Sequence, residues 1–293
     1  MSETGTMGFM YLHSHHLFAD AEAECHDAGY VIFGVPYDGT TSFRSGARNG
    51  PRAIRDLSYN FESYLPECGI DLADVPFADI GDIDPFCMPE MVVDQVRDTV
   101  AEIAAEGRIP VMLGGEHSIT TGAVRALSPD CYVVCDAHLD LRDAFQGSPY
   151  NHACTARRVY EEGIEDICII GARSGTREEY AFAEDLCVYS ADDVRRDGIR
   201  SVIDEIRSRL AGKKVYLSID ADAIDCCLTP GTGTPEPFGL TPQDVRDVIE
   251  ALAPLAAGFD YVEVCPIDAG QTAAVAARCV RTFIASHWSG SQG

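Results

Sequence analysis

Short apolar, β-branched runs recur along the whole chain, and longer stretches of helical periodicity separate them. Eight of these runs have the length and composition of buried strands. They lie at residues 30–36, 76–83, 109–113, 131–135, 167–170, 186–189, 215–219 and 259–264. Strands that alternate with helices favour a parallel sheet, and near-continuous apolar strands indicate helices on both of its faces. An eight-stranded barrel is the alternative, which periodicity leaves open.

The intervening stretches predict helices, among them residues 89–106, 118–127, 152–162, 191–210, 242–252 and 271–285. No linker, repeat or low-complexity segment divides the 293 residues. We therefore predict a single α/β domain over residues 1–293. Residues 1–25 precede the first strand, and we expect them to form a partly mobile N-terminal extension.

The charge balance is strongly acidic, with 47 acidic against 22 basic residues and a net charge of −25. Such a surface repels nucleic acid and anionic membranes, so we expect neither as a partner. Only Lys213 and Lys214 among the basic residues are lysines. Arginine in preference to lysine, with excess carboxylate, resembles the composition of salt-adapted proteins. We therefore expect a halophilic source, with an acidic enzyme from a mesophile as the alternative.

The chain has no apolar run of the roughly 18 residues that a membrane span needs. Residues 1–18 lack a basic segment followed by an apolar core, so we expect no secretory signal peptide. Several of the 12 cysteines lie inside apolar runs, where cysteine behaves as a small buried hydrophobe. These features predict a protein of the reducing cytoplasm.

Metal-ligating side chains follow three of the strand-like runs. The first motif, Gly114-Gly115-Glu116-His117-Ser118, supplies His117. The second, Asp136-Ala137-His138-Leu139-Asp140, supplies Asp136, His138 and Asp140. The third, Ser218-Ile219-Asp220-Ala221-Asp222, supplies Asp220 and Asp222. Alternate residues of a strand point to one face, and ligand sites in α/β sheets gather at the carboxyl ends of strands. Four carboxylates and two imidazoles in one cavity require cations to neutralise them. Oxygen and imidazole ligands suit a pair of Mn²⁺-like ions better than thiolate-seeking metals.

Two cations that share carboxylates would lower the pKa of a bridging water and supply hydroxide as a nucleophile, so the ligand set alone predicts a hydrolase. Metallophosphatases are an alternative, because they also use a D-x-H motif with two metals. Their pattern requires a Gly-Asp and a Gly-Asn-His/Asp element further along the chain. Here Gly81-Asp82 precedes the motif and Gly-Asn-His is absent, which makes phosphoester hydrolysis a distant third choice.

The chain resembles the ureohydrolases, the family of arginase and agmatinase, from about residue 30 to residue 285. Besides the three metal motifs, the resemblance includes Gly34-Val35-Pro36-Tyr37-Asp38 and the segment from Gly46 to Arg55. It implies a three-layer α/β/α sandwich with a central eight-stranded parallel sheet. It also implies two Mn²⁺ per chain and a homo-oligomer, a trimer or a hexamer. Deacetylases share this fold, but their ligand set lacks the second metal's aspartates.

The resemblance also implies a role for each site residue. One manganese would be held by His117, Asp136, Asp140 and Asp220, and the other by Asp136, His138, Asp220 and Asp222. Asp140 would orient the bridging hydroxide. His152 matches the histidine that shuttles a proton to the leaving amine, a step that a near-neutral imidazole can perform. Glu263 matches the glutamate that pairs with the substrate guanidinium, as a planar cation requires.

Substrate choice rests on two local features. Arginases carry an Asn soon after the second metal motif, whereas this chain continues Leu141-Arg142-Asp143. The stretch around Glu236 resembles the agmatinase form of its loop, and an acidic loop suits a substrate with a distal amine. We expect hydrolysis of agmatine to putrescine and urea by metal-bridging hydroxide, in polyamine biosynthesis. Arginase, a guanidinobutyrase-like guanidino-acid hydrolase, or a non-catalytic metal-binding homologue are the alternatives.

Two departures from the family pattern flank the predicted substrate entrance. Cys226 and Cys227 follow Asp225 where the family usually has proline, and Phe238 stands where agmatinases commonly have glycine. Both departures concern specificity, because neither removes a predicted metal ligand.

Overall fold

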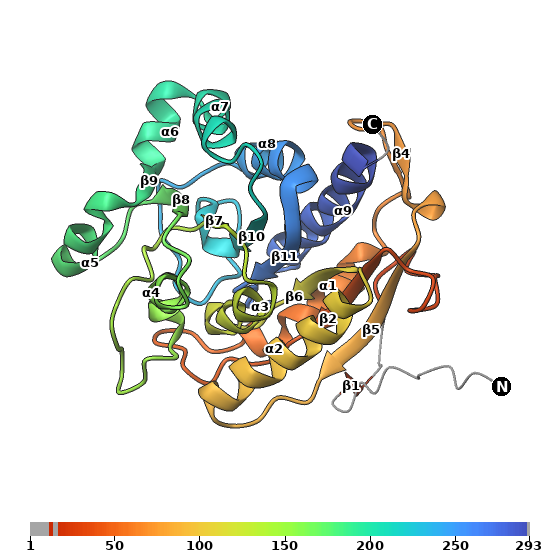
Figure 1. The fold of residues 1–293 in the computed structure, drawn as a ribbon, viewed down its shortest axis with the longest axis horizontal. Helices are drawn as coiled ribbons and strands as arrows, with labels where there is room; N and C mark the ends of the chain where they lie inside the picture. Colours follow the sequence, from red (N-terminus) through yellow and green to blue (C-terminus); the bar gives the residue numbers. More distant parts are fainter. Residues whose placement is uncertain (1–11, 14–16, 292–293) are drawn as a thin grey trace.

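The computed structural model describes residues 12–13 and 17–291, and Figure 1 gives the course of the chain. Its central sheet has nine strands in the order β1-β5-β2-β6-β11-β10-β7-β8-β9. Their bounds are β1 Leu12–His13, β2 Tyr30–Gly34, β5 Phe77–Ile83, β6 Ile109–Leu113, β7 Cys131–Cys135, β8 Ile167–Ala172, β9 Cys187–Ser190, β10 Val215–Asp220 and β11 Ala256–Val262. All pairings are parallel except that of the short edge strand β1 with β5.

The eight parallel strands are the eight predicted from the apolar runs. The sheet is open, with β1 and β9 at its edges, so the barrel alternative was wrong. A separate two-stranded sheet pairs β3 (Tyr64–Leu65) with β4 (Ile70–Asp71). It leaves the order of the main sheet unaffected.

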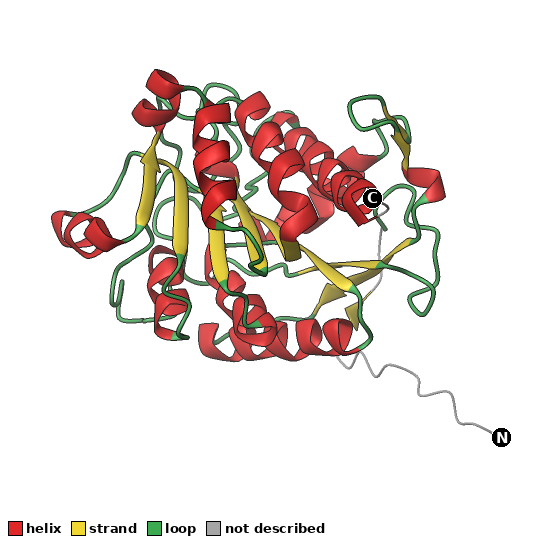
Figure 2. Cartoon of the chain, turned by 45° about the horizontal axis from the view of Figure 1, so that its top comes forward, coloured by secondary structure: helices red, strands yellow, loops and turns green. Residues whose placement is uncertain are grey.

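Helices cover both faces of the sheet, which makes the three layers visible in Figure 2. The helices are α1 Gly50–Ser58, α2 Pro89–Ala105, α3 Thr120–Leu127, α4 Thr155–Glu161, α5 Arg177–Phe182, α6 Ala191–Asp197, α7 Ile199–Arg209, α8 Pro242–Leu252 and α9 Gln271–Ser291. One buried core joins the sheet to α1 and α6–α9, and a second joins its other face to α2–α4. The strands are apolar on both faces because both faces are covered.

The predicted helix over residues 191–210 is two helices, α6 and α7, which Gly198 separates. Gly198 adopts φ 82° and ψ 141°, a backbone conformation that costs glycine little but other residues a great deal. The apolar periodicity runs through this break, so periodicity alone did not reveal it.

Most of the predicted N-terminal extension lies outside the described residues. The part that follows residue 16 is packed onto the domain. Phe18 is buried, and its backbone N–H donates to Asp79 at 2.7 Å, while that of Ala19 donates to Ser58 at 2.8 Å. The treatment of residues 1–293 as one domain remains a prediction.

No helix among residues 17–291 is long and apolar enough to cross a membrane. All 12 cysteines fall in the described part of the chain, and each is a free thiol there.

Candidate metal centre and active site

The six predicted metal ligands meet at the carboxyl ends of the parallel strands. His117 and Asp136 follow β6 and β7, and Asp220 is the last residue of β10. These three strands lie within a run of four neighbours, β6-β11-β10-β7. Because the strands are parallel, their carboxyl ends share one edge, where α/β folds bind ligands. The order of strands in the sheet therefore brings together segments that are far apart in the sequence.

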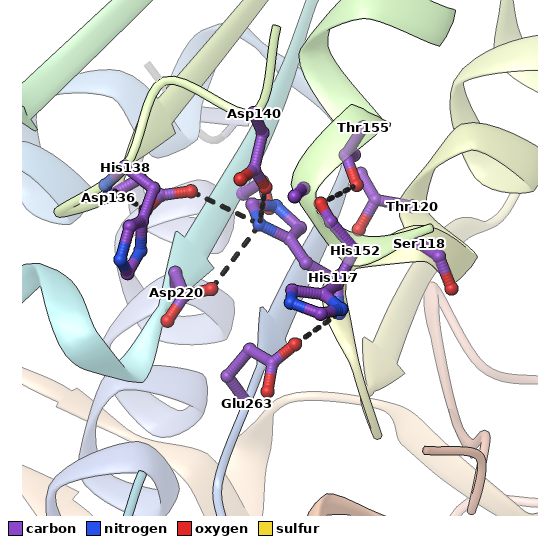
Figure 3. Close-up of polar contacts among 12 residues, drawn as sticks. His117, Ser118, Thr120, Asp136, His138, Asp140, His152, Thr155, Asp220 and Glu263 are labelled. Carbon is purple, nitrogen blue, oxygen red and sulfur yellow. Dashed lines mark hydrogen bonds and ion pairs between the residues drawn. The ribbon is translucent and has the colours of Figure 1, made fainter. Parts of the chain in front are cut away.

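His117 is the centre of the first group of ligands. Its Nδ1 atom lies 3.2 Å from Asp136 Oδ2, 3.1 Å from Asp140 Oδ2 and 3.3 Å from Asp220 Oδ2 (Figure 3). This nitrogen is buried and has no hydrogen-bond partner among the described residues. An orphaned nitrogen that faces three carboxylate oxygens fits a cation between them.

His138 is the centre of the second group. Its Nδ1 atom lies 3.1 Å from Asp222 Oδ2 and 3.6 Å from Asp136 Oδ1. Ligand atoms of His117, Asp136 and Asp140 lie within 4.8 Å of one another, as do those of Asp136, His138 and Asp222. Asp136 belongs to both groups, so the arrangement suits two cations that share this carboxylate. The donors are oxygens and imidazole nitrogens, which match Mn²⁺-like ions.

The protein without cations keeps protons in this cluster. Burial, reinforced by the charge of Asp136, raises the pKa of Asp140 to about 7. Burial and the charges of Asp222 and Asp136 hold the pKa of Asp220 well above its usual range. Burial alone would lower the pKa of His117, but Tyr132 and the neighbouring carboxylates raise it well above the ordinary value. Cations would replace these protons, because metal ligands bind deprotonated.

The strand-alternation argument for these ligands was wrong in detail. β7 ends at Cys135, so Asp136, His138 and Asp140 lie beyond it. β10 ends at Asp220, and Asp222 lies in a 3-10 turn over Ala221–Ala223. The ligands converge because the chain turns sharply after each strand. Asp140 adopts φ 52°, a strained conformation of the kind that functional sites store.

The two glycines before Glu116 allow neighbouring segments to approach the backbone closely. A Cβ atom at Gly115 would lie 1.9 Å from the carbonyl oxygen of Tyr37, so only glycine allows this approach. The hydroxyl of Ser118 donates to Glu116 Oε1 at 2.6 Å. The loop is thus fixed by the buried carboxylate of Glu116.

A second layer of polar residues, which sequence reasoning missed, lies behind His117. Its Nε2 atom is 3.1 Å from both Tyr132 Oη and Ser218 Oγ, and Ser218 donates to the buried Asp260 carboxylate. Asp260 also accepts the hydroxyls of Thr120 at 2.8 Å and Tyr216 at 2.7 Å. Partners of this kind fix the orientation of a metal-binding imidazole. The signal in the sequence was a lone aspartate inside the apolar run of β11.

His152 starts a 3-10 turn over His152–Cys154 and lies to one side of the metal ligands in the view of Figure 3. Its Nε2 atom is 3.1 Å from Ser42 Oγ, and its backbone N–H donates to Thr40 Oγ1 at 3.1 Å. Thr40 in turn donates to Glu116 at 2.6 Å. Burial and the charge of His138 lower the pKa of His152 to about 4. At neutral pH the imidazole is therefore uncharged and can take up a proton.

Glu263 follows directly after β11 and has φ 63°. Its Oε1 atom accepts the backbone N–H of His117 at 2.8 Å (Figure 3). Burial and the nearby charge of Glu116 raise the pKa of Glu263 to about 8. A cationic guanidinium beside it would favour the ionised form. Glu263 thus offers a buried carboxylate next to the metal ligands.

Glu236 lies on the loop of residues 231–240, called here the Glu236 loop. Its Oε1 atom is 3.6 Å from His138 Nε2, which places the predicted substrate-binding carboxylate at the rim of the metal site. Arg173, which sequence reasoning missed, holds this loop. Its guanidinium donates to the carbonyl oxygens of Gly171, Asp222, Ala223, Glu236 and Pro237.

The Arginase family model matches residues 28–285 of this chain. The N(1)-aminopropylagmatine ureohydrolase of Thermococcus kodakarensis is 43% identical over 278 residues, or 92% of this chain and 94% of the relative. The agmatinase of Pyrococcus horikoshii is 42% identical over 260 residues, covering 86% of this chain and 89% of the relative. The crystal structure of the agmatine ureohydrolase of Thermoplasma volcanium is 42% identical with a TM-score of 0.90, covering 96% and 97% of the two chains.

The architecture and the paired His/Asp clusters define an arginase-like α/β protein with a candidate two-cation site. With a family match that extends over most of its length, the chain belongs to the arginase family.

Proposed function

We propose that this protein hydrolyses the guanidino group of agmatine, releasing urea and putrescine. The observation that carries the proposal is the convergence of the six predicted ligands with Glu263, a buried carboxylate beside His117. Relatives at 42–43% identity that are named for agmatine or aminopropylagmatine hydrolysis support the same substrate class.

Two bound Mn²⁺ would supply hydroxide at neutral pH and stabilise the charge that develops on the attacked carbon's substituents. Asp136 and Asp220 would bridge the two cations, while His117 and Asp140 complete one site and His138 and Asp222 the other. Asp140 Oδ2 lies 3.1 Å from His117 Nδ1, and the Asp140 carboxylate would orient the nucleophile by accepting a hydrogen bond from it.

Glu263 would pair with the substrate guanidinium and hold its carbon over the metal ligands. His152, neutral in the resting site, would take up the proton released in the attack and pass it to the departing amine. This order of events matches a lowered pKa better than a histidine that is charged from the start. We accordingly propose that His152 is a proton shuttle whose imidazole first acts as a base.

Glu236 would bind the distal amine of the substrate, since its carboxylate lies at the rim and is partly exposed. N(1)-aminopropylagmatine is the second candidate substrate, because the relative named for that compound matches 92% of this chain at 43% identity. This compound carries an additional secondary amine, so both candidates place positive charge near Glu236. Arginase and guanidino-acid hydrolase activities are disfavoured, because their substrates would bring a carboxylate to an acidic loop.

The decisive experiment is urea release by the Mn²⁺-loaded protein in molar KCl. Agmatine, N(1)-aminopropylagmatine, arginine and guanidinobutyrate are assayed in parallel. We expect turnover of one or both amine-bearing substrates and little of the other two. Turnover confined to arginine or guanidinobutyrate would overturn the assignment. Asp220→Asn serves as the control for metal-dependent chemistry, and unchanged turnover in this variant would contradict the mechanism.

We further propose a halophilic, cytoplasmic homo-oligomer, a trimer or a hexamer by resemblance to the family. The net charge of −25 and the 12 free thiols support salt adaptation and a reducing compartment, respectively. Light scattering coupled to size exclusion in high and low KCl tests the oligomeric state.

A further inference from the structure

A second group of metal-ligating side chains lies at the amino ends of the parallel strands, opposite the candidate active site. Cys131 is the first residue of β7, Asp166 directly precedes β8, and Cys168 is its second residue. Both thiols belong to the core that α6 and α7 cover, and these helices lie over the β8–β9 end of the sheet (Figure 1). The active site lies at the carboxyl ends of the strands, so this group is separate from it.

The three ligand atoms are close enough to share one ion. Cys131 Sγ, a carboxylate oxygen of Asp166 and Cys168 Sγ all lie within 4.8 Å of one another. Zinc bound tetrahedrally with Zn–S distances of about 2.3 Å requires ligand atoms about 3.8 Å apart. Small side-chain rotations therefore suffice to close the site. Cys187 lies directly across from Cys168 in β9, and its thiol contacts that of Cys168.

We propose that Cys131, Asp166 and Cys168 form a binding site for a soft divalent cation such as Zn²⁺, with Cys187 available as a fourth ligand. The ligands come from two separate strands, so the ion would fasten the amino ends of β7 and β8 to each other. Two sulfur ligands select against Mn²⁺ and in favour of Zn²⁺ or Cd²⁺. The sulfur ligands thus distinguish this site from the candidate manganese centre, whose ligands are oxygens and imidazole nitrogens.

The surroundings supply the counter-charges that such a site needs. Arg209 Nε donates to Asp166 Oδ1 at 2.6 Å, and Lys213 Nζ donates to its Oδ2 at 2.5 Å. Each carboxylate oxygen has a second lone pair, so both remain able to bind a metal. With protonated thiols, the two cations and one carboxylate have a net charge of +1. Exchange of two thiol protons for one divalent cation leaves that charge unchanged.

Two of the thiols, those of Cys168 and Cys187, have raised pKa values. A hydrogen bond with Cys131 raises the pKa of Cys168 to about 12, and contact with Cys168 raises the pKa of Cys187. Binding therefore releases protons, and affinity increases with pH. Asp166 and Lys213 are partly exposed, which gives an ion a route from the surface.

Another pair of thiols provides the matched control. Asp225, Cys226 and Cys227 also bring ligand atoms within 4.8 Å of one another. All three belong to one partly exposed turn, and both Asp225 oxygens already accept backbone N–H groups, from Cys227 and Gly239. The ligand atoms of this turn thus come from one short segment, whereas those of the proposed site come from two strands. The Cys226→Ser/Cys227→Ser variant therefore removes background thiols without touching the proposed site.

The test uses reduced, full-length Cys226→Ser/Cys227→Ser protein, loaded with Mn²⁺ and titrated with Cd²⁺. Cadmium bound to thiolate gives an ultraviolet charge-transfer band that oxygen and nitrogen ligands do not produce. We expect one thiolate-bound Cd²⁺ per chain, two protons released per ion, and a higher melting temperature. Absence of the band, or binding without proton release, would overturn the proposal.

Two additional substitutions locate the ion. Cys131→Val keeps the buried volume and is expected to abolish the band. Asp166→Asn changes a partly exposed position and is expected to weaken Cd²⁺ binding at least tenfold, which keeps the proposal testable if Cys131→Val does not fold. A band of unchanged amplitude and affinity in both variants would place the ion elsewhere. The proposal does not depend on the agmatine-hydrolysing activity, and none of these measurements uses turnover.

Discussion

The guanidinium group of Arg173 binds the backbone carbonyl oxygen of Glu236 and not its carboxylate. The Nη2 atom of Arg173 donates to the carbonyl oxygen of Glu236 at 2.8 Å and also to that of Asp222 at 2.8 Å. One guanidinium group thus connects a predicted metal ligand to the predicted substrate-binding residue. The contact thus ties the Glu236 loop to the turn that carries Asp222.

We predict that Arg173→Lys raises KM for agmatine more than it lowers kcat. Lysine has three donors at one point, whereas the planar guanidinium reaches carbonyls in several directions. The Glu236 loop therefore loses support while most metal ligands stay in place. Steady-state kinetics with Arg177→Lys, at an exposed position of α5, as the control checks the prediction. Equal losses in both variants would contradict it.

Ser218→Ala should weaken the binding of Mn²⁺ by about 10- to 100-fold, the usual effect of removing a partner of a metal-binding histidine. The substitution removes the hydroxyl that links His117 Nε2 to Asp260. Metal affinity is measured by titration of metal-depleted protein. Ser208→Ala, on the surface of α7, is the matched control and should bind Mn²⁺ normally. Wild-type affinity in Ser218→Ala would mean that Tyr132 alone orients the imidazole.

Stability of the metal-free protein should fall as pH rises from 6.5 to about 8. Glu263, with its pKa raised to about 8, binds its proton more firmly in the folded than in the unfolded chain, and the same holds for His117. Stability from such groups is lost as pH rises. The lowered pKa of His152 acts oppositely, but only below 6.5.

Melting temperatures with and without Mn²⁺ across this pH range provide the measurement. The stabilisation by Mn²⁺ should increase with pH, because cations replace the protons that the cluster loses. A difference that shrinks with rising pH would refute the prediction.

Phe238→Gly should raise the free energy of unfolding by up to about 1 kcal/mol. Phe238 adopts φ 63°, in the left-handed region where glycine is favoured, and its side chain is 84% exposed. Little packing is lost, and backbone strain is relieved. Denaturant unfolding compares this variant with Phe238→Ala, which keeps the strain. A larger gain from alanine than from glycine would rule out strain as the cause.

Low salt should destabilise the protein. The 47 acidic residues repel one another, and salt screens this repulsion at the surface. We expect the melting temperature to increase as KCl is raised from millimolar to molar concentration. An unchanged melting temperature would remove the argument for salt adaptation.

The strands were predictable because their apolar runs reflect burial on both faces, a property of composition and local order. The ligand residues were predictable because Asp136 and Asp220 stand immediately after such runs. Their convergence was expected for the wrong reason, since the turns after β7 and β10 create it. Asp260 and Arg173 were missed because all the hydroxyl partners of Asp260, and four of the five carbonyl groups that Arg173 contacts, lie more than 40 residues away in the sequence. Only the order of the strands in the sheet brings such pairs together.

The chain has two lysines, and both lie where the chain enters β10, at the amino edge of the sheet. Lys213 pairs with Asp166, and Lys214 donates to the carbonyl oxygen of Leu127. Chemical coupling through the lysine amines would thus attach the protein to a solid support at the amino ends of the strands, near the start of β10. The edge with the candidate active site would then face the solution, so immobilised enzyme should keep its access to small substrates.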